Sequence, residues 1–443
     1  LYSVGRPPEG YNWEVTTIMS SFLGKQIPWV IISVVAWFVI HHFIDRDFWV
    51  IGSYPIYGAT IVLLVLVLLI GKEINNARSW FSIAGFTFQP SELAKFGTAL
   101  AMAAFLSQWS EKLNQLGSFG SALLIMLLPA GLIILQPDPG SGLVFISFFL
   151  VMYREGLPPL VLIFGGFSAL MLILGILQPP LVLAGGLLGV LLMILALSAP
   201  RRSLWWVLGV VSGLVGAGYL YWYQALGWEI LLALSGLFVA GIVFFLLKRN
   251  FQLVTITTVA LIWGVLVASV ANFTFNNVLR PHQQERIDAW LRPYRLTERG
   301  ALYNVTQSKL AIAAGGVSGK GLGEGTITKY KYVPVQESDF IFSAVGEAEG
   351  LMGSLMVILA FLALLWRISI IAERQKRTFV RAYAYGLAGI IFIHVLVNIG
   401  MAMGLMPVIG IPLPFLSKGG SSLLSFTVMI AVLLKLDRHR DDV

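Results

Sequence analysis

Residues 336–366 read QESDFIFSAVGEAEGLMGSLMVILAFLALLW, and they join the long polar passage of residues 272–339 to an apolar segment. A membrane-spanning helix needs about 20 predominantly apolar residues, and the run from Phe340 to Trp366 supplies them. Asp339 stands directly before this run. A carboxylate at the mouth of a membrane helix, behind a basic and glycine-rich loop, indicates chemistry on an anionic substrate at a bilayer surface.

The composition identifies the chain as a membrane protein. Of its 443 residues 57% are hydrophobic and only 12% are charged, whereas about a quarter of the residues in globular domains are charged. The chain contains no cysteine, which excludes disulfides, thiolate metal sites and a cysteine nucleophile. Its five histidines show no metal-ligand spacing beyond one adjacent pair. We predict an all-α polytopic membrane protein with no soluble domain of ordinary size and no nucleic-acid partner.

Apolar runs predict about 13 transmembrane helices, with Gly and Pro scattered among them as bilayer helices tolerate. The first residues resemble the end of a segment, so one further span is expected before Leu1. The predicted spans are Ile27–Phe43, Tyr54–Gly71, Leu93–Gln108, Ser118–Leu135, Gly142–Tyr153, Leu160–Leu177, Leu181–Ser198, Leu204–Tyr221, Ile230–Leu247, Leu253–Ala271, Phe340–Trp366, Tyr383–Gly404 and Phe415–Leu436.

Lys and Arg residues predict the orientation, because short cytoplasmic connections collect them. Basic clusters at 201–202, 248–249, 367–381 and 435–440 fall on one side when the spans are counted. This side is predicted to be the cytoplasm, which places residues 272–339 on the extracytoplasmic face. That loop is itself basic, but loops of about 60 residues are largely exempt from the rule, so its basic excess needs another reason.

The polar loop has local patterns of its own. Gln307–Ala314 has helical composition, and Thr326–Val333 alternates as a strand does. The glycine-rich segment 315–323 is predicted to be a flexible turn and not a P-loop, because Ala314 and Gly321 stand where that motif needs Gly and Ser or Thr. Its backbone amides remain able to cradle a phosphate; the alternative is a simple hairpin turn.

Ionisable side chains at membrane depth are usually functional or paired. Glu92 and Lys95 follow Pro90 and share one face of a helix. They either neutralise each other, or Lys95 contacts a phosphate while Glu92 orients it. Asp138, in a turn between prolines, is either a turn former or helix cap, or takes a direct part in catalysis.

Asp339 also has two interpretations. Ser338 or Asp339 would cap the helix that begins at Phe340. Alternatively, desolvation at the apolar margin raises the pKa of the Asp339 carboxyl toward that of a general base. Glu347 lies about two turns deeper in the same helix.

Several blocks in this sequence resemble the SEDS family of bacterial cell-wall proteins, RodA and FtsW. They occur in the family's order and span residues 88 to 422. The blocks are Phe88–Lys95 (FQPSELAK), Gln136–Asp138 (QPD), Tyr303–Ser308 (YNVTQS), Gly319–Gly321 (GKG), Ser338–Phe342 (SDFIF), Asn398–Met401 (NIGM) and Pro412–Ser422 (PLPFLSKGGSS).

The resemblance implies a peptidoglycan glycosyltransferase that polymerises lipid II on the extracytoplasmic face of the bacterial inner membrane, with a class B penicillin-binding protein as partner. It implies that Asp339 is the catalytic aspartate and that Glu92 and Lys95 are important positions. The wider set of expected substrate-binding residues is Glu92, Lys95, Asp138, Arg286, Gln307, Lys320 and Glu347.

Family members usually have ten spans, so about four appear as additions between the two halves of the membrane core. The expected division is 1–157 for the first part of the core, 158–271 for extra helices, 272–339 for the large extracytoplasmic loop, and 340–443 for the second part of the core. Details also depart from the family pattern, including Arg292 before Pro293 and Lys418 in place of Tyr.

The expected reaction has Asp339 take the proton from the acceptor sugar hydroxyl as it attacks the donor sugar, with inversion and release of undecaprenyl pyrophosphate. Lys95, Arg286, Lys320 or a divalent cation such as Mg²⁺ or Mn²⁺ would stabilise the leaving charge. A RodA-like elongation role is favoured over FtsW-like division. The alternatives are a lipid II flippase or other transporter, and a scaffold that holds the transpeptidase.

Overall fold

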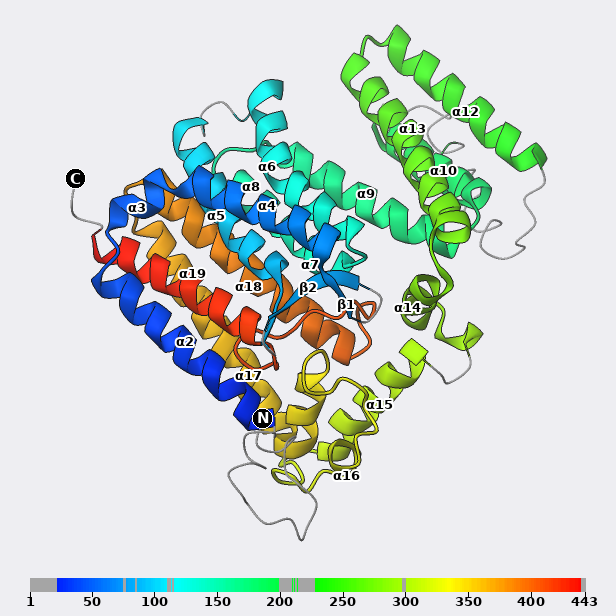
Figure 1. Ribbon diagram of the computed structural model, residues 1–443. Coiled ribbons are helices and arrows are strands. Elements are labelled where there is room, and N and C mark those ends of the chain that lie inside the picture. Colours follow the sequence, from blue (N-terminus) through cyan, green and yellow to red (C-terminus); the bar gives the residue numbers. More distant parts are fainter. Residues whose placement is uncertain are drawn as a thin grey trace. The chain divides into compact units, whose positions relative to one another are not determined.

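The structure is a computed structural model that describes residues 22–74, 77–83, 86–109, 113, 115–198, 209, 211, 213, 228–296 and 300–439 (Figure 1). The chain divides into two compact units. The first unit joins Leu1–Pro158 to Glu285–Val443, and the second unit is Pro159–Gln284. The second unit includes all but the first residue of the segment 158–271 that is expected to hold extra helices. That these helices are additions to the family fold stays a prediction.

The first unit consists mainly of long helices. Its N-terminal part contains α2 (Phe22–His42), α3 (Arg46–Ile51), α4 (Ser53–Ile70), β1 (Lys72–Ile74), β2 (Ala77–Ile83), β3 (Phe86–Phe88), α5 (Pro90–Trp109), α6 (Leu116–Leu135), α7 (Pro139–Leu143), η2 (Val144–Ser147) and α8 (Phe148–Arg154). Its C-terminal part contains η4 (Pro293–Arg295), α15 (Gly300–Gly315), α16 (Thr326–Lys329), α17 (Ile341–Glu373), α18 (Thr378–Ala402) and α19 (Gly420–Arg438), while α14 (Pro281–Leu291) crosses the boundary between the units.

The second unit is built from α9 (Pro159–Leu177), α10 (Pro180–Ser198), α12 (Trp228–Leu247), α13 (Phe251–Phe273) and the π-helical turn η3 (Thr274–Val278). α13 packs against α9, α10 and α12. The core of the second unit is aliphatic and aromatic, with Leu187, Leu191, Leu234 and Phe238 buried. Polar side chains also form contacts within the unit; the Asn272 side-chain amide, for example, donates to the Gly175 carbonyl at 3.1 Å.

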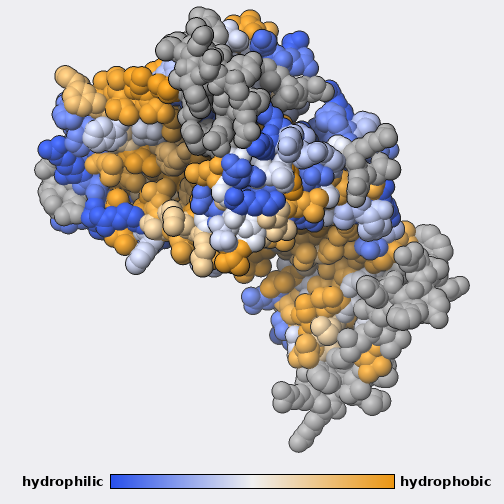
Figure 2. All heavy atoms as spheres, turned by 90° about the horizontal axis from the view of Figure 1, so that it is seen from below, coloured by the Kyte–Doolittle hydropathy of each residue, from blue (hydrophilic) through white to orange (hydrophobic). Residues whose placement is uncertain are grey.

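Eight helices of the described residues are long and apolar enough to cross a membrane, and three shorter apolar helices accompany them. The structure places a helix at every predicted span except Leu204–Tyr221, which lies outside the described residues apart from 209, 211 and 213. Large hydrophobic areas cover the surface in Figure 2, interrupted by hydrophilic patches. Such a surface is what lipid-facing helices present, and the chain is a multi-pass membrane protein.

α5 and α18 lie at the centre of the first unit. α5 packs against α4, α6, α18 and α19, and α18 packs against α17 and α8. Small residues allow close approach between membrane helices; at Gly97 of α5, a Cβ atom would stand 2.7 Å from the Thr60 hydroxyl of α4. α2 runs alongside α19 on the outside of this unit (Figure 1). The central helices are therefore fixed by packing on several sides.

Charged contacts gather at one end of the first unit. The Arg381 guanidinium binds the Glu155 carboxylate at 2.7 Å, and Arg374 pairs with Asp437. Arg374, Arg381 and Asp437 belong to the connections 367–381 and 435–440, which the sequence predicts to be cytoplasmic. Arg374 and Asp437 lie at the C-terminal ends of α17 and α19, so the starts of these two helices are separated from the charged contacts by the helix lengths.

One local prediction in the polar loop is wrong, and one small sheet elsewhere was not predicted. Thr326–Val333 is not a strand: it contains the short helix α16 and a turn in which Lys331 has a φ of 54°. Glu347 accepts hydrogen bonds from the Ile327 and Thr328 amides, so a distant carboxylate stabilises helical backbone there. The antiparallel sheet β1-β2-β3 was not predicted; Phe81 pairs with Phe88 in it. The helix predicted at Gln307–Ala314 is confirmed within α15.

Candidate active site

Asp339 belongs to a segment whose backbone is fixed by donors from two other elements. The Lys418 amide donates to the Glu337 carbonyl at 2.8 Å, and the Ser417 hydroxyl donates to the Ser338 carbonyl. The Asn398 amide of α18 donates to the Asp339 carbonyl at 2.8 Å and to the Ile411 carbonyl at 2.7 Å. Three successive carbonyls are thus held in place, which fixes where the Asp339 side chain begins.

The predicted capping role of Ser338 or Asp339 is wrong. The N-cap of α17 is Phe340, and no side-chain cap hydrogen bond is formed there. Phe340 is buried, so packing of its ring sets the start of the helix. The Asp339 carboxylate is therefore not used to cap α17.

The Asp339 side chain is half-buried and lies against the backbone of residue 410. Gly410 has a φ of 77°, and a Cβ atom on it would stand 3.2 Å from Asp339 Oδ2. Burial is the largest influence on the Asp339 carboxyl and raises its pKa. A hydrogen bond with Ser338 and the positive charge of Arg286 lower this pKa, whereas the negative charge of Asp138 raises it. The net effect is a raised pKa. Arg286 and Asp138 therefore belong to the electrostatic surroundings of Asp339.

Asp138 acts as a helix cap, which confirms one of its two interpretations. Its carboxylate accepts hydrogen bonds from the Ser141 amide at 3.1 Å and the Ser141 hydroxyl at 2.8 Å, at the start of α7. The Gln89 side-chain amide donates to Asp138 Oδ2 at 2.9 Å, the same oxygen that accepts from the Ser141 hydroxyl. The next turn packs against residue 409, since a Cβ atom at Gly140 would stand 2.8 Å from the Ile409 carbonyl oxygen. A direct catalytic part for Asp138 stays a prediction.

Glu92 and Lys95 form a buried ion pair in the first turns of α5. Lys95 Nζ donates to Glu92 Oε1 at 2.7 Å, and both side chains are almost completely removed from solvent, at 0% and 2% exposed. Lys95 Nζ also lies 2.9 Å from His394 Nε2. The two residues therefore neutralise each other as the first interpretation states, and Lys95 is enclosed by protein in this arrangement.

Glu347 and Lys320 tie the glycine-rich segment to α17. The fully buried Glu347 carboxylate accepts from the Ile327 amide at 3.0 Å and the Thr328 amide at 2.7 Å, and Lys320 Nζ lies 3.5 Å from it. The Lys320 and Gly321 amides donate to the Glu347 and Ala348 carbonyls. Because these two amides already have backbone partners, they support the interpretation of a structural turn; a phosphate-binding role for the other amides of the segment stays a prediction. The Lys320 side chain remains partly exposed, at 35%.

The structure brings together Asp339, Asp138 and Arg286, and separately Lys320 with Glu347 and Glu92 with Lys95. Gln307 lies half-buried on α15, and Arg286 is exposed on α14. His394, Asn398 and Gln89 were not singled out as site residues. A histidine and an asparagine four residues apart inside an apolar run share one helix face, and that spacing is the signal that could have found two of them.

Within the described part of the chain, no group of three or more His, Asp or Glu side chains is placed to hold a metal ion. Asp138 and Asp339 alone do not make an all-protein cage for a divalent cation, which prefers several oxygen ligands. These residues therefore do not by themselves fit a resident metal.

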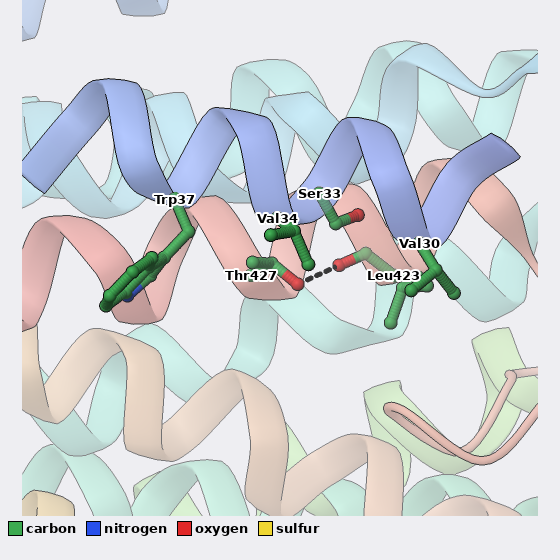
Figure 3. Close-up of a pocket in the computed structure, with 6 residues that line it drawn as sticks. All are labelled: Val30, Ser33, Val34, Trp37, Leu423 and Thr427. Carbon is green, nitrogen blue, oxygen red and sulfur yellow. Dashed lines mark hydrogen bonds between the residues drawn. The ribbon is translucent and has the colours of Figure 1, made fainter. Parts of the chain in front are cut away.

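An apolar pocket of about 220 Å³ lies between α2 and α19 (Figure 3). Its lining residues are Val30, Ser33, Val34, Trp37, Leu423 and Thr427. The Thr427 hydroxyl donates to the Leu423 carbonyl at 2.8 Å, so it is already satisfied. The pocket has no acid, base or cation in its lining and does not compete with Asp339 as a site of chemistry.

Comparison with known proteins gives consistent results. The sequence model of the FtsW/RodA/SpoVE family, which is described as "Cell cycle protein", matches residues 11–181 and 206–442 of this chain. The chain is 31% identical over 440 residues to peptidoglycan glycosyltransferase RodA of Treponema pallidum, covering 97% of this chain and 91% of that protein. It is 28% identical over 385 residues to peptidoglycan glycosyltransferase MrdB of Escherichia coli K12, and the match covers 87% of this chain and 77% of MrdB.

Solved structures share the fold. A chain of a peptidoglycan synthase complex, described as coordinating polymerization and crosslinking, superposes with a TM-score of 0.61 at 25% identity and covers 95% of this chain and 91% of that one. RodA of Thermus thermophilus superposes with a TM-score of 0.54 at 23% identity, and the match covers 99% of this chain and 91% of that RodA chain. The family match also runs through most of residues 158–271, further than the sequence blocks indicated. This chain belongs to the FtsW/RodA/SpoVE family.

Proposed function

We propose that the chain polymerises lipid II into glycan strands at the extracytoplasmic face of the bacterial inner membrane, with a RodA-like role in cell elongation. As a member of its family, the chain is a peptidoglycan glycosyltransferase. The RodA-like role is supported by the 31% identity to a RodA, against 26% and 27% for two FtsW proteins. The observation that carries the mechanism is the Asp339 carboxyl, held at the start of α17 with a raised pKa.

Asp339 is the general base of the proposed reaction. Its carboxylate removes the proton from the 4-hydroxyl of the acceptor sugar as that oxygen attacks C1 of the donor sugar. The attack comes from the face opposite the pyrophosphate, so one displacement inverts the anomeric centre and gives a β-linked glycan from an α-linked donor. A base works best when its pKa is near the operating pH, and burial moves the pKa of Asp339 in that direction.

Cationic side chains stabilise the departing undecaprenyl pyrophosphate in this proposal. Arg286 is exposed and close enough to influence Asp339 electrostatically, and Lys320 is partly exposed. Lys95 acts differently because its ammonium is buried and bonded to Glu92 and His394, so Lys95 and Glu92 support the site from within. Glu347 holds the segment that carries Lys320. A divalent cation, where the reaction uses one, would take its ligands mainly from the phosphates and water.

The remaining predicted substrate contacts have separate parts in the proposal. Gln307 on α15 contacts the saccharide, and Asp138 tunes Asp339 through its negative charge. The membrane lipid surrounds the polyprenyl tail, for which the apolar surfaces of the helices provide a path. A class B penicillin-binding protein crosslinks the product strands; support for this partner is the fold likeness to a chain of a peptidoglycan synthase complex.

The test is an assay of the purified chain with labelled lipid II, with and without its cognate class B penicillin-binding protein. Lengthening glycan strands and released undecaprenyl pyrophosphate are expected. A lipid II flippase would instead move the label across vesicle bilayers and leave its length unchanged. Transbilayer movement without any polymer, in the presence of the partner, would overturn the proposed function.

A further inference from the structure

His394 lies in the middle of α18 and has no part in the reaction proposed above. Its side chain is 1% exposed. Nε2 lies 2.9 Å from Lys95 Nζ, and Nδ1 lies 2.8 Å from the Pro412 carbonyl oxygen. The imidazole therefore bridges the buried ion pair of α5 and the backbone of the loop between α18 and α19.

The partners of the ring determine its tautomer. An ammonium group has only donors and a carbonyl oxygen only accepts. Lys95 must then donate to Nε2, and Nδ1 must carry the hydrogen that it donates to Pro412. A neutral imidazole with its proton on Nδ1 satisfies both contacts, and a second proton would set two cations against each other.

The contact at Pro412 lies next to the contacts that hold Asp339. Asn398, one helical turn after His394, donates both to the Ile411 carbonyl and to the Asp339 carbonyl. The Ser417 hydroxyl accepts from the Leu413 amide at 2.7 Å and donates to the Ser338 carbonyl. A continuous set of contacts thus runs from Lys95 through His394 and residues 411–418 to the backbone of the catalytic segment.

We propose that His394 is a positioning residue for the glycosyltransferase reaction: it uses the charged Lys95 as an anchor to hold residues 411–418 in the arrangement that places Asp339. The proposal rests on the proposed function. His394 touches neither substrate nor reacting atoms in it. Its effect passes through the Pro412 carbonyl, because a loop with several bonds to residues 337–339 cannot shift without moving them.

The absence of native cysteine makes the loop directly measurable. Leu413 is 1% exposed, so a thiol at Leu413→Cys reacts with maleimide only when the loop opens. Adding His394→Leu removes both ring contacts, so the Pro412 carbonyl oxygen loses its imidazole donor and the Lys95 ammonium keeps only Glu92 of its two partners. Labelling is expected to quicken on the order of 10- to 100-fold. His394→Gln keeps an acceptor and a donor and should restore slow labelling. Ala311→Cys, buried in α15, is the control and should label at an unchanged rate.

Activity supplies the second readout. With the loop loosened, water reaches Asp339 and reduces the desolvation that raises its pKa, so the acid limb of the rate profile should move to lower pH in His394→Leu and return in His394→Gln. A mere loss of folded protein would scale the whole profile without moving it. If His394→Leu does not fold, His394→Met takes its place, since methionine adapts to irregular spaces.

Unchanged labelling of Leu413→Cys together with an unmoved acid limb, in either apolar variant, would overturn the positioning role. Equal loss in His394→Gln and His394→Leu would also overturn it, because the hydrogen bonds would then be irrelevant. The labelling result does not depend on polymerisation. Failure of the unmodified chain to polymerise lipid II would therefore overturn the proposed function and leave the loop measurement to stand by itself.

Discussion

The side chain of Asp339 has residue 410 as a close neighbour, and only glycine suits that position. A Cβ atom there would stand 3.2 Å from Oδ2, and the φ of 77° disfavours other residues. We expect Gly410→Ala to lower the rate of lipid II polymerisation about tenfold through crowding, beyond the roughly 1–2 kcal/mol of backbone strain.

Gly316→Ala is the matched control. Gly316 has a φ of 58°, but a Cβ atom there would meet nothing within 4 Å. Thermal unfolding should show a similar loss of stability in both variants, while only Gly410→Ala loses activity. Equal activity of the two variants would contradict the close packing of residue 410 on Asp339.

The charges around Asp339 predict opposite shifts in the pH dependence. The carboxyl must be ionised to act as a base, and its pKa is raised, so the rate should fall as pH falls through a midpoint above that of an ordinary carboxyl. Arg286→Gln removes a charge that lowers the pKa, so the midpoint should rise. Asp138→Asn removes a charge that raises it, so the midpoint should fall. Profiles of kcat/KM against pH measure both, and shifts of the same sign would rule out this electrostatic arrangement.

At the residue scale the sequence indicates candidate acids more readily than it indicates the partners of those acids. Glu92 and Lys95 pair because they stand three positions apart on one helix, which is a local relation. His394 and Lys95 are 299 positions apart, and no local pattern joins them. Phe340 takes the N-cap that was predicted for Ser338 or Asp339, because burial of its ring outweighs capping preference.

At the scale of elements, the buried ion pair of α5 should be highly sensitive to the loss of one partner. Lys95→Met leaves the enclosed Glu92 charge uncompensated, and such changes destabilise by about 3–5 kcal/mol. Arg154→Met removes the partner of Glu373 at a pair that is 46% and 51% exposed, where about 0–1 kcal/mol is expected. Measuring the free energy of unfolding in detergent micelles compares Lys95→Met with Arg154→Met. Equal losses of stability in the two variants would contradict the burial of the α5 pair.

Apolar helices were predictable because length and hydrophobicity alone define them. The short elements were not. α16 forms where residues alternate as in a strand, since Glu347, about twenty positions along the chain, binds its first amides. The sheet of β1, β2 and β3 pairs strands as short as three residues, too short for a clear alternating pattern.

For the whole molecule, the predicted orientation can be tested on a chain without native thiols. Lys331 and Lys376 are both exposed and lie in the polar loop and in the basic connection between α17 and α18. A membrane-impermeant maleimide should label Lys331→Cys in intact spheroplasts and Lys376→Cys only after lysis. The reverse pattern would place Asp339 on the wrong side of the membrane for lipid II polymerisation.

In the proposed function, the whole molecule holds the Asp339 carboxyl at the boundary between lipid and water. Purified Asp339→Asn protein, matched to the unmodified chain for folding by thermal unfolding and assayed with labelled lipid II and the partner transpeptidase, tests this claim most directly. Loss of a general base should slow glycan synthesis by about 10²–10⁴-fold while lipid II still binds. Glycan strands made by Asp339→Asn at the unmodified rate would contradict the account.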